Sequence, residues 1–289
     1  MYSTNNNSLT KFFGISEDDT NSGWDTLGKD SYHIQDDDTG IILLWQERTL
    51  YDYPLATIYD LYSKIGSEVL MILCTSLTAA RGSGERKWIN TQWNTSNFNA
   101  NICLKVSREI SEQVWNLQER ISVAIADTLL LYHPDIHINY PFHYTINGGK
   151  VAWHLIQKIR LDSEYDFLRI GIGTNTAPMP PRLPNNDQLA QDLFRSSYSL
   201  DIPSVQWIDL AKKYKENIKT SLQGDSRHHD FLEYLNLKEW DPIEVYEDNG
   251  TIQFGSMIVR WVFWSLNTDG SIVIGKIPLE RREYHIKKY

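Results

Sequence analysis

Residues 144–175, YTINGGKVAWHLIQKIRLDSEYDFLRIGIGTN, decide the fold of this chain because they predict three consecutive β-strands. An Asn-Gly-Gly triplet at 147–149 supplies the positive-φ residues of a tight hairpin. Residues 151–161 are a long and mostly apolar strand pattern. Residues 167–172 are a nearly continuous apolar run, which is typical of a strand covered on both faces. The pattern ends in Gly-Ile-Gly-Thr-Asn at 171–175, where two glycines let the backbone come close to whatever lies above the sheet. We therefore expect an antiparallel meander that forms the floor of a ligand pocket.

The rest of the chain predicts an α+β fold. Apolar strand patterns cover residues 41–47, 69–75, 100–106 and 136–140, and amphipathic helix patterns cover residues 54–63, 117–132, 203–222 and 231–237. In the last fifty residues or so, short strand patterns alternate with Asn/Asp-Gly turns, which predicts a small SH3-like barrel. The expected organisation is a mixed, mostly antiparallel sheet flanked by helices over residues 41–237, followed by an SH3-like C-terminal β-barrel over residues 238–289.

Residues 1–40 differ from the rest because they are rich in Asn, Ser, Thr and Asp and show little periodicity. The aromatic residues Phe12, Phe13, Trp24 and Tyr32 are the exceptions. We expect an N-terminal arm that is poorly structured or docked on a partner through these rings, with a disordered leader as the alternative.

Composition and charge exclude several classes of protein. The net charge of −9 argues against nucleic acid as the main partner, since no clustered basic face is visible. No apolar run approaches the roughly 18–20 residues that a membrane span needs. Cys74 and Cys103 lie in apolar strand patterns and predict buried free thiols in a reducing compartment, with the cytoplasm as the default and the mitochondrial matrix as the alternative. No metal site is expected, because Pro134 keeps His133 and His137 off a common helix.

A Gly-rich basic loop follows the strand pattern at 69–75. Its sequence, Arg-Gly-Ser-Gly-Glu-Arg-Lys-Trp at 81–88, is of the kind that presents backbone N–H groups and guanidinium to an anion.

This loop is one of four segments that together resemble the biotin protein ligases of the biotin/lipoate A/B protein ligase superfamily. The segments are residues 81–88, Asn-Tyr-Pro-Phe-His at 139–143, Gly-Lys-Val-Ala-Trp at 149–153 and Gly-Ile-Gly-Thr-Asn at 171–175. The resemblance covers about residues 41–289 and implies the fold that biotin ligases share with class II aminoacyl-tRNA synthetases. It also implies an enzyme that joins biotin to AMP, using ATP and Mg, and transfers the biotinyl group to a lysine of a carrier domain.

The resemblance also implies which residues would form the site. Ligand-pocket positions carried over in this way are Thr57, Ser83, Trp88, Asn139, Trp153, Gly171, Gly173 and Asn175. If the protein is active, the residues expected to clamp the reacting anions are Arg81, Arg86, Lys87 and Lys150.

Several of these positions depart from the family pattern where the chemistry needs them. Ser83 stands where the family has an arginine that holds the adenylate, and Asn139 stands where it has a lysine. Trp153 replaces the glycine that lies against biotin. Losing one charge-assisted contact to a developing anion costs on the order of 3 kcal/mol. An indole buries roughly 150–250 Å² where ligand should lie. The pattern predicts a ligase-like fold without catalysis.

Three hypotheses follow. The favoured one is a non-catalytic pseudoenzyme that binds no cofactor and serves as a structural or interaction subunit, with protein partners in a multi-subunit assembly. The second is a divergent ligase that activates biotin, lipoate or another acyl acid. The third is a module that holds a nucleotide or a carrier domain without reaction.

Overall fold

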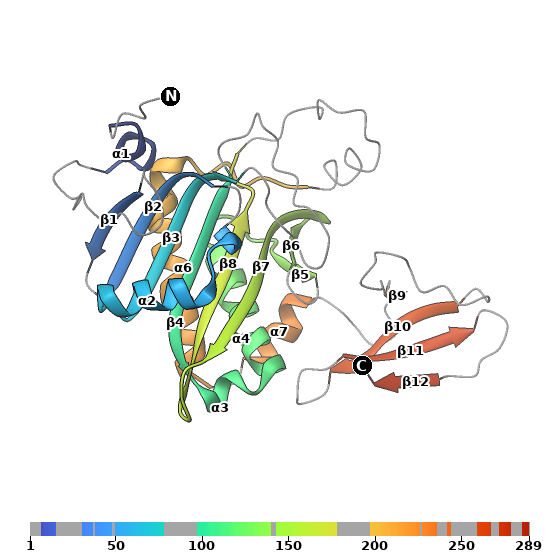
Figure 1. The fold of residues 1–289 in the computed structure, drawn as a ribbon. Coiled ribbons are helices and arrows are strands. Elements are labelled where there is room, and N and C mark those ends of the chain that lie inside the picture. Colours follow the sequence, from blue (N-terminus) through green and yellow to red (C-terminus); the bar gives the residue numbers. More distant parts are fainter. Residues whose placement is uncertain are drawn as a thin grey trace.

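The computed structural model describes residues 7–15, 31–36, 38–47, 50–77, 97–139, 143–177, 197–225 and 227–235, together with four short strands beyond residue 241. Its main feature is an eight-stranded mixed sheet in the order β1-β2-β3-β4-β8-β7-β6-β5, with helices on both faces (Figure 1). Only β2 and β3 pair in parallel, and the other neighbours are antiparallel. The expected mixed, mostly antiparallel sheet flanked by helices is confirmed.

The strands of this sheet are β1 Ser31–Asp36, β2 Thr39–Glu47, β3 Val69–Leu77, β4 Phe98–Ser107, β5 His137–Asn139, β6 His143–Ile146, β7 Gly149–Arg160 and β8 Tyr165–Thr174. The helices are α1 Asn7–Phe13, α2 Leu55–Ile65, α3 Arg108–Ser111, α4 Val114–Leu130, α6 Trp207–Gln223 and α7 His228–Leu235, with short 3₁₀ turns η2 Leu50–Asp52 and η3 Ser204–Gln206.

The predicted meander is present as β6, β7 and β8. Asn147 and Gly148 adopt φ angles of 50° and 77°, so the Asn-Gly pair makes the tight turn that its sequence predicts. Strand β8 lies between β4 and β7 and is buried along almost its whole length, because helices cover one of its faces and α2 packs on the other. The continuous apolar run at 167–172 is thus explained by cover on both faces.

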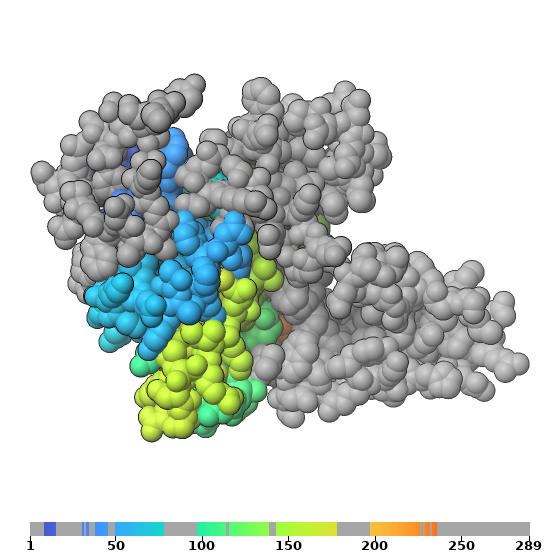
Figure 2. Space-filling view, in the orientation of Figure 1, coloured from blue at the N-terminus to red at the C-terminus, as the bar shows by residue number. Residues whose placement is uncertain are grey.

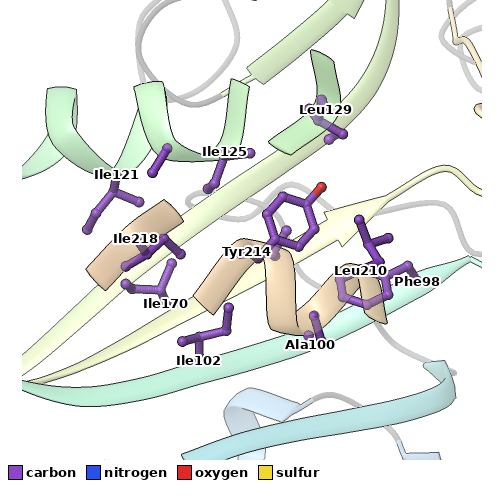
Figure 3. Packing of buried hydrophobic residues seen from close by; sticks show 14 of the residues in the cluster. Phe98, Ala100, Ile102, Ile121, Ile125, Leu129, Ile170, Leu210, Tyr214 and Ile218 are labelled. Carbon is purple, nitrogen blue, oxygen red and sulfur yellow. The ribbon is translucent and has the colours of Figure 1, made fainter. Parts of the chain in front are cut away.

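The larger core lies between the sheet and helices α4 and α6. Figure 3 shows the side chains of these helices turned toward β4 and β8. The residues labelled there are fully or almost fully buried: Phe98, Ala100, Ile102, Ile121, Ile125, Leu129, Ile170, Leu210, Tyr214 and Ile218. Their helical spacing in α4 and α6 places one apolar stripe of each helix on the sheet.

The smaller core lies on the opposite face, under α2. Buried side chains of α2, including Ile58 and Leu61, pack over Leu70, Ile72 and neighbouring strand residues. The rings of Tyr59 and Tyr62 lie 5.2 and 5.1 Å from the ring of Phe167 in β8. Figure 2 shows this side of the molecule, where the blue segment that contains α2 lies against the yellow-green of β7 and β8.

The N-terminal part differs from the expected arm over the residues described. Residues 7–13 form α1, and Phe12 and Phe13 make edge-on contacts with Trp207 at the start of α6. The Ser204 hydroxyl donates a hydrogen bond to the carbonyl of Phe12 at 2.8 Å. Residues 31–36 add β1 to the edge of the sheet. Phe12 and Phe13 therefore dock on the chain's own core, because burying their rings offsets the low helix signal of the polar residues around them. Trp24 lies outside the described residues.

The C-terminal strands form a second sheet in the order β12-β11-β10-β9. The strands are β9 Pro242–Ile243, β10 Val259–Leu266, β11 Ile272–Pro278 and β12 His285–Lys288, all antiparallel to their neighbours. Residues 251–254, which carry one of the short strand patterns of the C-terminal part, lie outside the described residues. The SH3-like barrel and the domain boundaries at 40 and 237 stay predictions.

Both cysteines are buried free thiols, as their apolar surroundings predict. Among the residues described, no helix is both long enough and apolar enough to cross a membrane.

Candidate functional site

The Gly-x-Gly corner at the end of β8 lies on the sheet face that α2 covers. Gly171 and Gly173 are flanked in register by Leu155 and Trp153 of β7. On their other side lie Asn101 and Asn99 of β4, which are 1% and 2% exposed. A face made of two glycines and two buried amides is able to accept a ring laid flat on the backbone.

Trp153 supplies one such ring. Its side chain is 6% exposed, and the indole lies directly on Gly173, its cross-strand partner. A Cβ atom added at Gly173 would lie 2.7 Å from Cε2 of the indole, closer than two carbon atoms pack. The indole therefore occupies the space that the absent glycine side chain leaves.

Tyr51 supplies the second ring, over Gly171. A Cβ atom added at Gly171 would lie 2.8 Å from Cζ of this phenol. The Tyr51 hydroxyl lies 3.4 Å from the carbonyl oxygen of Leu155, to which it donates. Burial raises the pKa of Tyr51 well above its usual value, so the phenol stays neutral. Both glycines of the corner are thus covered by aromatic side chains of the same chain.

Arg169 holds the Tyr51 segment in place from within β8. Its Nη1 donates to the carbonyl oxygens of Tyr53 at 2.7 Å and of Leu50 at 3.3 Å. Its Nε donates to Gln157 Oε1 at 2.8 Å, and Nη2 bonds to the same oxygen. The guanidinium carbon lies 4.8 Å from the centre of the Tyr51 ring. Burial lowers the pKa of Arg169, since desolvation disfavours the charged form.

Lys150 and Asn175 lie together at the same end of the meander. Asn175 is 3% exposed, and its Nδ2 donates to the carbonyl oxygen of Lys150 at 2.9 Å. Its backbone N–H donates to the carbonyl of Val151 at 2.8 Å. In this structure Asn175 joins the end of β8 to the start of β7.

The other residues expected in the site lie elsewhere or outside the described part of the chain. Thr57 is in the first turn of α2 and its side chain is exposed. Asn139 ends β5, where its backbone pairs with His143. Residues 78–96, which include Arg81, Ser83, Arg86, Lys87 and Trp88, lie outside the described residues. The ligand-pocket and clamp roles of all these residues stay predictions.

Sequence reasoning missed Tyr51, Arg169 and the two asparagines of β4. A signal was present for Arg169, because a charged residue inside a continuous apolar strand requires buried hydrogen-bond partners. Tyr51 precedes the helix-opening Pro54 in a polar segment, and nothing in its sequence neighbourhood indicates which surface it covers.

A separate polar network lies on the opposite face of β7, under α4. His154 is fully buried, and its Nδ1 lies 2.8 Å from the Tyr144 hydroxyl. Its Nε2 lies 2.6 Å from Nε2 of Gln118, an amide nitrogen that donates. Burial, aided by the nearby His143, lowers the pKa of His154 to about 3. The imidazole is therefore neutral, with its proton on Nδ1.

No group of three or more His, Cys, Asp or Glu side chains is placed to hold a metal ion within the described ranges.

The contact between Tyr51 and Gly171 can be measured as a coupling energy. We expect Gly171→Ala to lower the free energy of unfolding by about 1–3 kcal/mol, because the added methyl group displaces the phenol. The same substitution in a Tyr51→Ala background should cost much less, since the ring is gone. Urea unfolding of the two single variants and the double variant checks this. Tyr53→Ala is the matched control, and in that background Gly171→Ala should lower the free energy of unfolding as much as it does in the wild type. An equal loss in the Tyr51→Ala background would contradict the contact.

Comparison with solved structures finds biotin protein ligases. One match is the biotin protein ligase from Aquifex aeolicus in complex with biotin and ATP, with a TM-score of 0.51 and 13% identity, covering 86% of this chain and 99% of that one. A second is the biotin protein ligase from Leishmania major in complex with biotinyl-5-AMP, with a TM-score of 0.49 and 17% identity, covering 86% and 98%. The fold assignment rests on the first.

The chain has a biotin protein ligase-like fold. No protein-family profile matches the sequence, and no curated protein matches it. At 13% identity this match shows the fold alone, and the chemistry has to be argued from the residues of the site.

Proposed function

We propose that this protein is a non-catalytic relative of the biotin protein ligases, kept as a structural or interaction subunit that works through protein contacts. The observation that carries this proposal is the cover over both glycines of the corner. Trp153 lies on Gly173 and Tyr51 lies on Gly171. A ligand ring laid on the same backbone would have to displace an indole and a phenol that are already packed.

The biotin ring does not fit the residues present at this corner. Displacing a packed aromatic side chain exposes its apolar surface and leaves a strained or solvated ring, which costs about 3 kcal/mol or more for each residue. The departures from the family pattern at Ser83 and Asn139 act in the same direction, because both remove a cation that would face an anion. Filling of the pocket and loss of positive charge together favour a fold retained for its shape.

Calorimetric titration of the full chain tests the proposal. Four compounds should be titrated: biotin, ATP, biotin methyl ester and adenosine. The last two carry the ring systems without the ionised groups. We expect no saturable heat with either uncharged compound. Micromolar affinity for biotin methyl ester or adenosine would contradict the proposal, because only an open ring pocket binds them.

One observation favours the second candidate, a divergent ligase that makes an acyl-adenylate from ATP and biotin or lipoate. Lys150 and Asn175, which the family pattern also has, lie together beside the corner. Such an enzyme would use Lys150 with Arg81, Arg86 and Lys87 as its anion clamp, and would need Mg. Pyrophosphate release on incubation with ATP and several acids, followed by transfer to a carrier domain, would establish it. Absence of pyrophosphate release with every acid tested supports the non-catalytic assignment.

A further inference from the structure

Arg169 is a buried cation without a buried anion to match it. Its side chain is 2% exposed. Its partners are two backbone carbonyls, the Gln157 amide oxygen and the Tyr51 ring, all of which are uncharged. No carboxylate in the described part of the chain forms an ion pair with it. A guanidinium taken out of water is expensive to keep unless an anion completes its surroundings.

The donor count leaves room for such an anion. A guanidinium has five N–H donors. Arg169 uses four of them, two toward Gln157 and one each toward the carbonyls of Leu50 and Tyr53. The remaining donor is on Nη2, and bonds from guanidinium to oxyanions are among the stronger hydrogen bonds in proteins.

An open depression of about 560 Å³ is lined by Arg169 and by the start of α2. Pro54 and Leu55 both line it, and Pro54 gives this helix no side-chain cap. The first N–H groups of a helix have no intrahelical partner and carry partial positive charge. An uncapped helix start and a buried guanidinium therefore border the same space.

Three charged side chains line the depression, and Arg169 is the one that is deeply buried. Lys158 and Arg169 are cationic, and Asp52 is the one carboxylate among the lining residues. The Lys158 Nζ donates to the carbonyl of Ser111 at 2.7 Å and lies 3.6 Å from Oδ2 of the buried Asp166, so its charge is already paired.

We propose that this depression binds a small oxyanion, a carboxylate or a phosphate group, held by Arg169 and the start of α2. Neither glycine lines the depression, and Tyr51, which does, keeps its place over Gly171, so the site works while both rings stay packed. It therefore goes beyond the proposed function, and it offers a protein that has lost the adenylate site a means of responding to a charged metabolite.

Titration of the full chain with inorganic phosphate and with acetate, at constant ionic strength made up with chloride, tests this site. Thermal shift and amide chemical shifts around Gln157 and Leu55 are the readouts. We expect saturable binding of at least one anion, and the tighter of the two identifies the class of group bound. Absence of saturable binding by either anion would overturn the proposal.

Charge variants give responses of opposite sign. Asp52→Asn should tighten anion binding about three- to tenfold, because it removes the one carboxylate that lines the depression. Arg169→Gln should abolish it. Arg160→Gln is the matched control, because Arg160 is on the same strand but is exposed and does not line the depression. If Arg169→Gln fails to fold, the response of Asp52→Asn still decides; equal affinities of Asp52→Asn and the wild type would overturn the site.

The same variants separate this site from the proposed function. Biotin or ATP that binds through its carboxylate or phosphates should be competed by phosphate and lost in Arg169→Gln. Biotin methyl ester and adenosine report on the ring pocket alone. Failure of the anion site thus leaves the non-catalytic assignment standing, and the reverse also holds.

Discussion

Replacing Trp153 with glycine should lower the free energy of unfolding by about 3–5 kcal/mol, because the indole is buried and its loss leaves a cavity over Gly173. The cavity should have the shape of the missing ring. Added indole is therefore expected to raise the melting temperature of the variant and to move the Gly173 amide resonance, with neither effect in the wild type. Thermal unfolding and heteronuclear NMR with increasing indole measure both.

Trp207→Ala is the matched control for this experiment. Trp207 is fully buried, but it lies in the aromatic cluster with Phe12, Phe13 and Phe98, on the sheet face that α4 and α6 cover. We expect a comparable loss of stability and no movement of the Gly173 signal when indole is added. Trp153→Gly with wild-type stability, or indole rescue that leaves Gly173 unmoved, would show that the indole does not fill the corner.

Lowering the pH should destabilise the protein through His154. The folded-state pKa of about 3 lies below the unfolded value near 6.5, so the unfolded state takes up the proton first. The stability that the neutral His154 contributes is fully present above pH 6.5. As the pH drops from there toward 3, the free energy of unfolding falls by up to about 1.4 kcal/mol per pH unit. A proton on Nε2 would also face the donor of Gln118, which adds to the cost of burying the charge.

Urea unfolding between about pH 7.5 and pH 5, above the range in which most carboxylates titrate, measures the slope. His154→Gln keeps a hydrogen-bonding side chain that does not titrate, so we expect lower stability at pH 7 and a shallower slope. Burial also lowers the pKa of His33, which should leave part of the slope in place. His229→Gln, at an exposed helix position, is the control and should retain the wild-type slope. An unchanged slope in His154→Gln would contradict the assignment.

The folding pattern of the meander could be predicted because its signals are local. An Asn-Gly turn and alternating or continuous apolar runs depend on residues next to each other in sequence, and β6, β7 and β8 form as expected. Helix α1 and strand β1 could not be predicted in the same way. Their sequences are polar and weakly periodic. Helix α1 is held by contacts with Trp207, which is distant in the chain, and β1 is held by pairing with β2.

In the candidate site, too, some features could be predicted from the sequence and others could not. A tryptophan in place of a glycine is visible in the sequence, and it predicts that the pocket is filled. The second cover, Tyr51 on Gly171, is separated from its glycine by 120 positions, and only the packing of η2 against β8 brings them together. The same holds for Arg169, whose carbonyl partners at Leu50 and Tyr53 precede it by more than a hundred residues.

By itself, the sequence determined the class of fold, the positions of the meander and the loss of positive charge from the ligase-like motifs. Those properties follow from residue type and short-range periodicity. Only the tertiary structure decided that two rings close the glycine corner and that a buried guanidinium borders an open depression. Both depend on which side chains meet across the sheet, and that is set by strand register and long-range packing that no local pattern specifies.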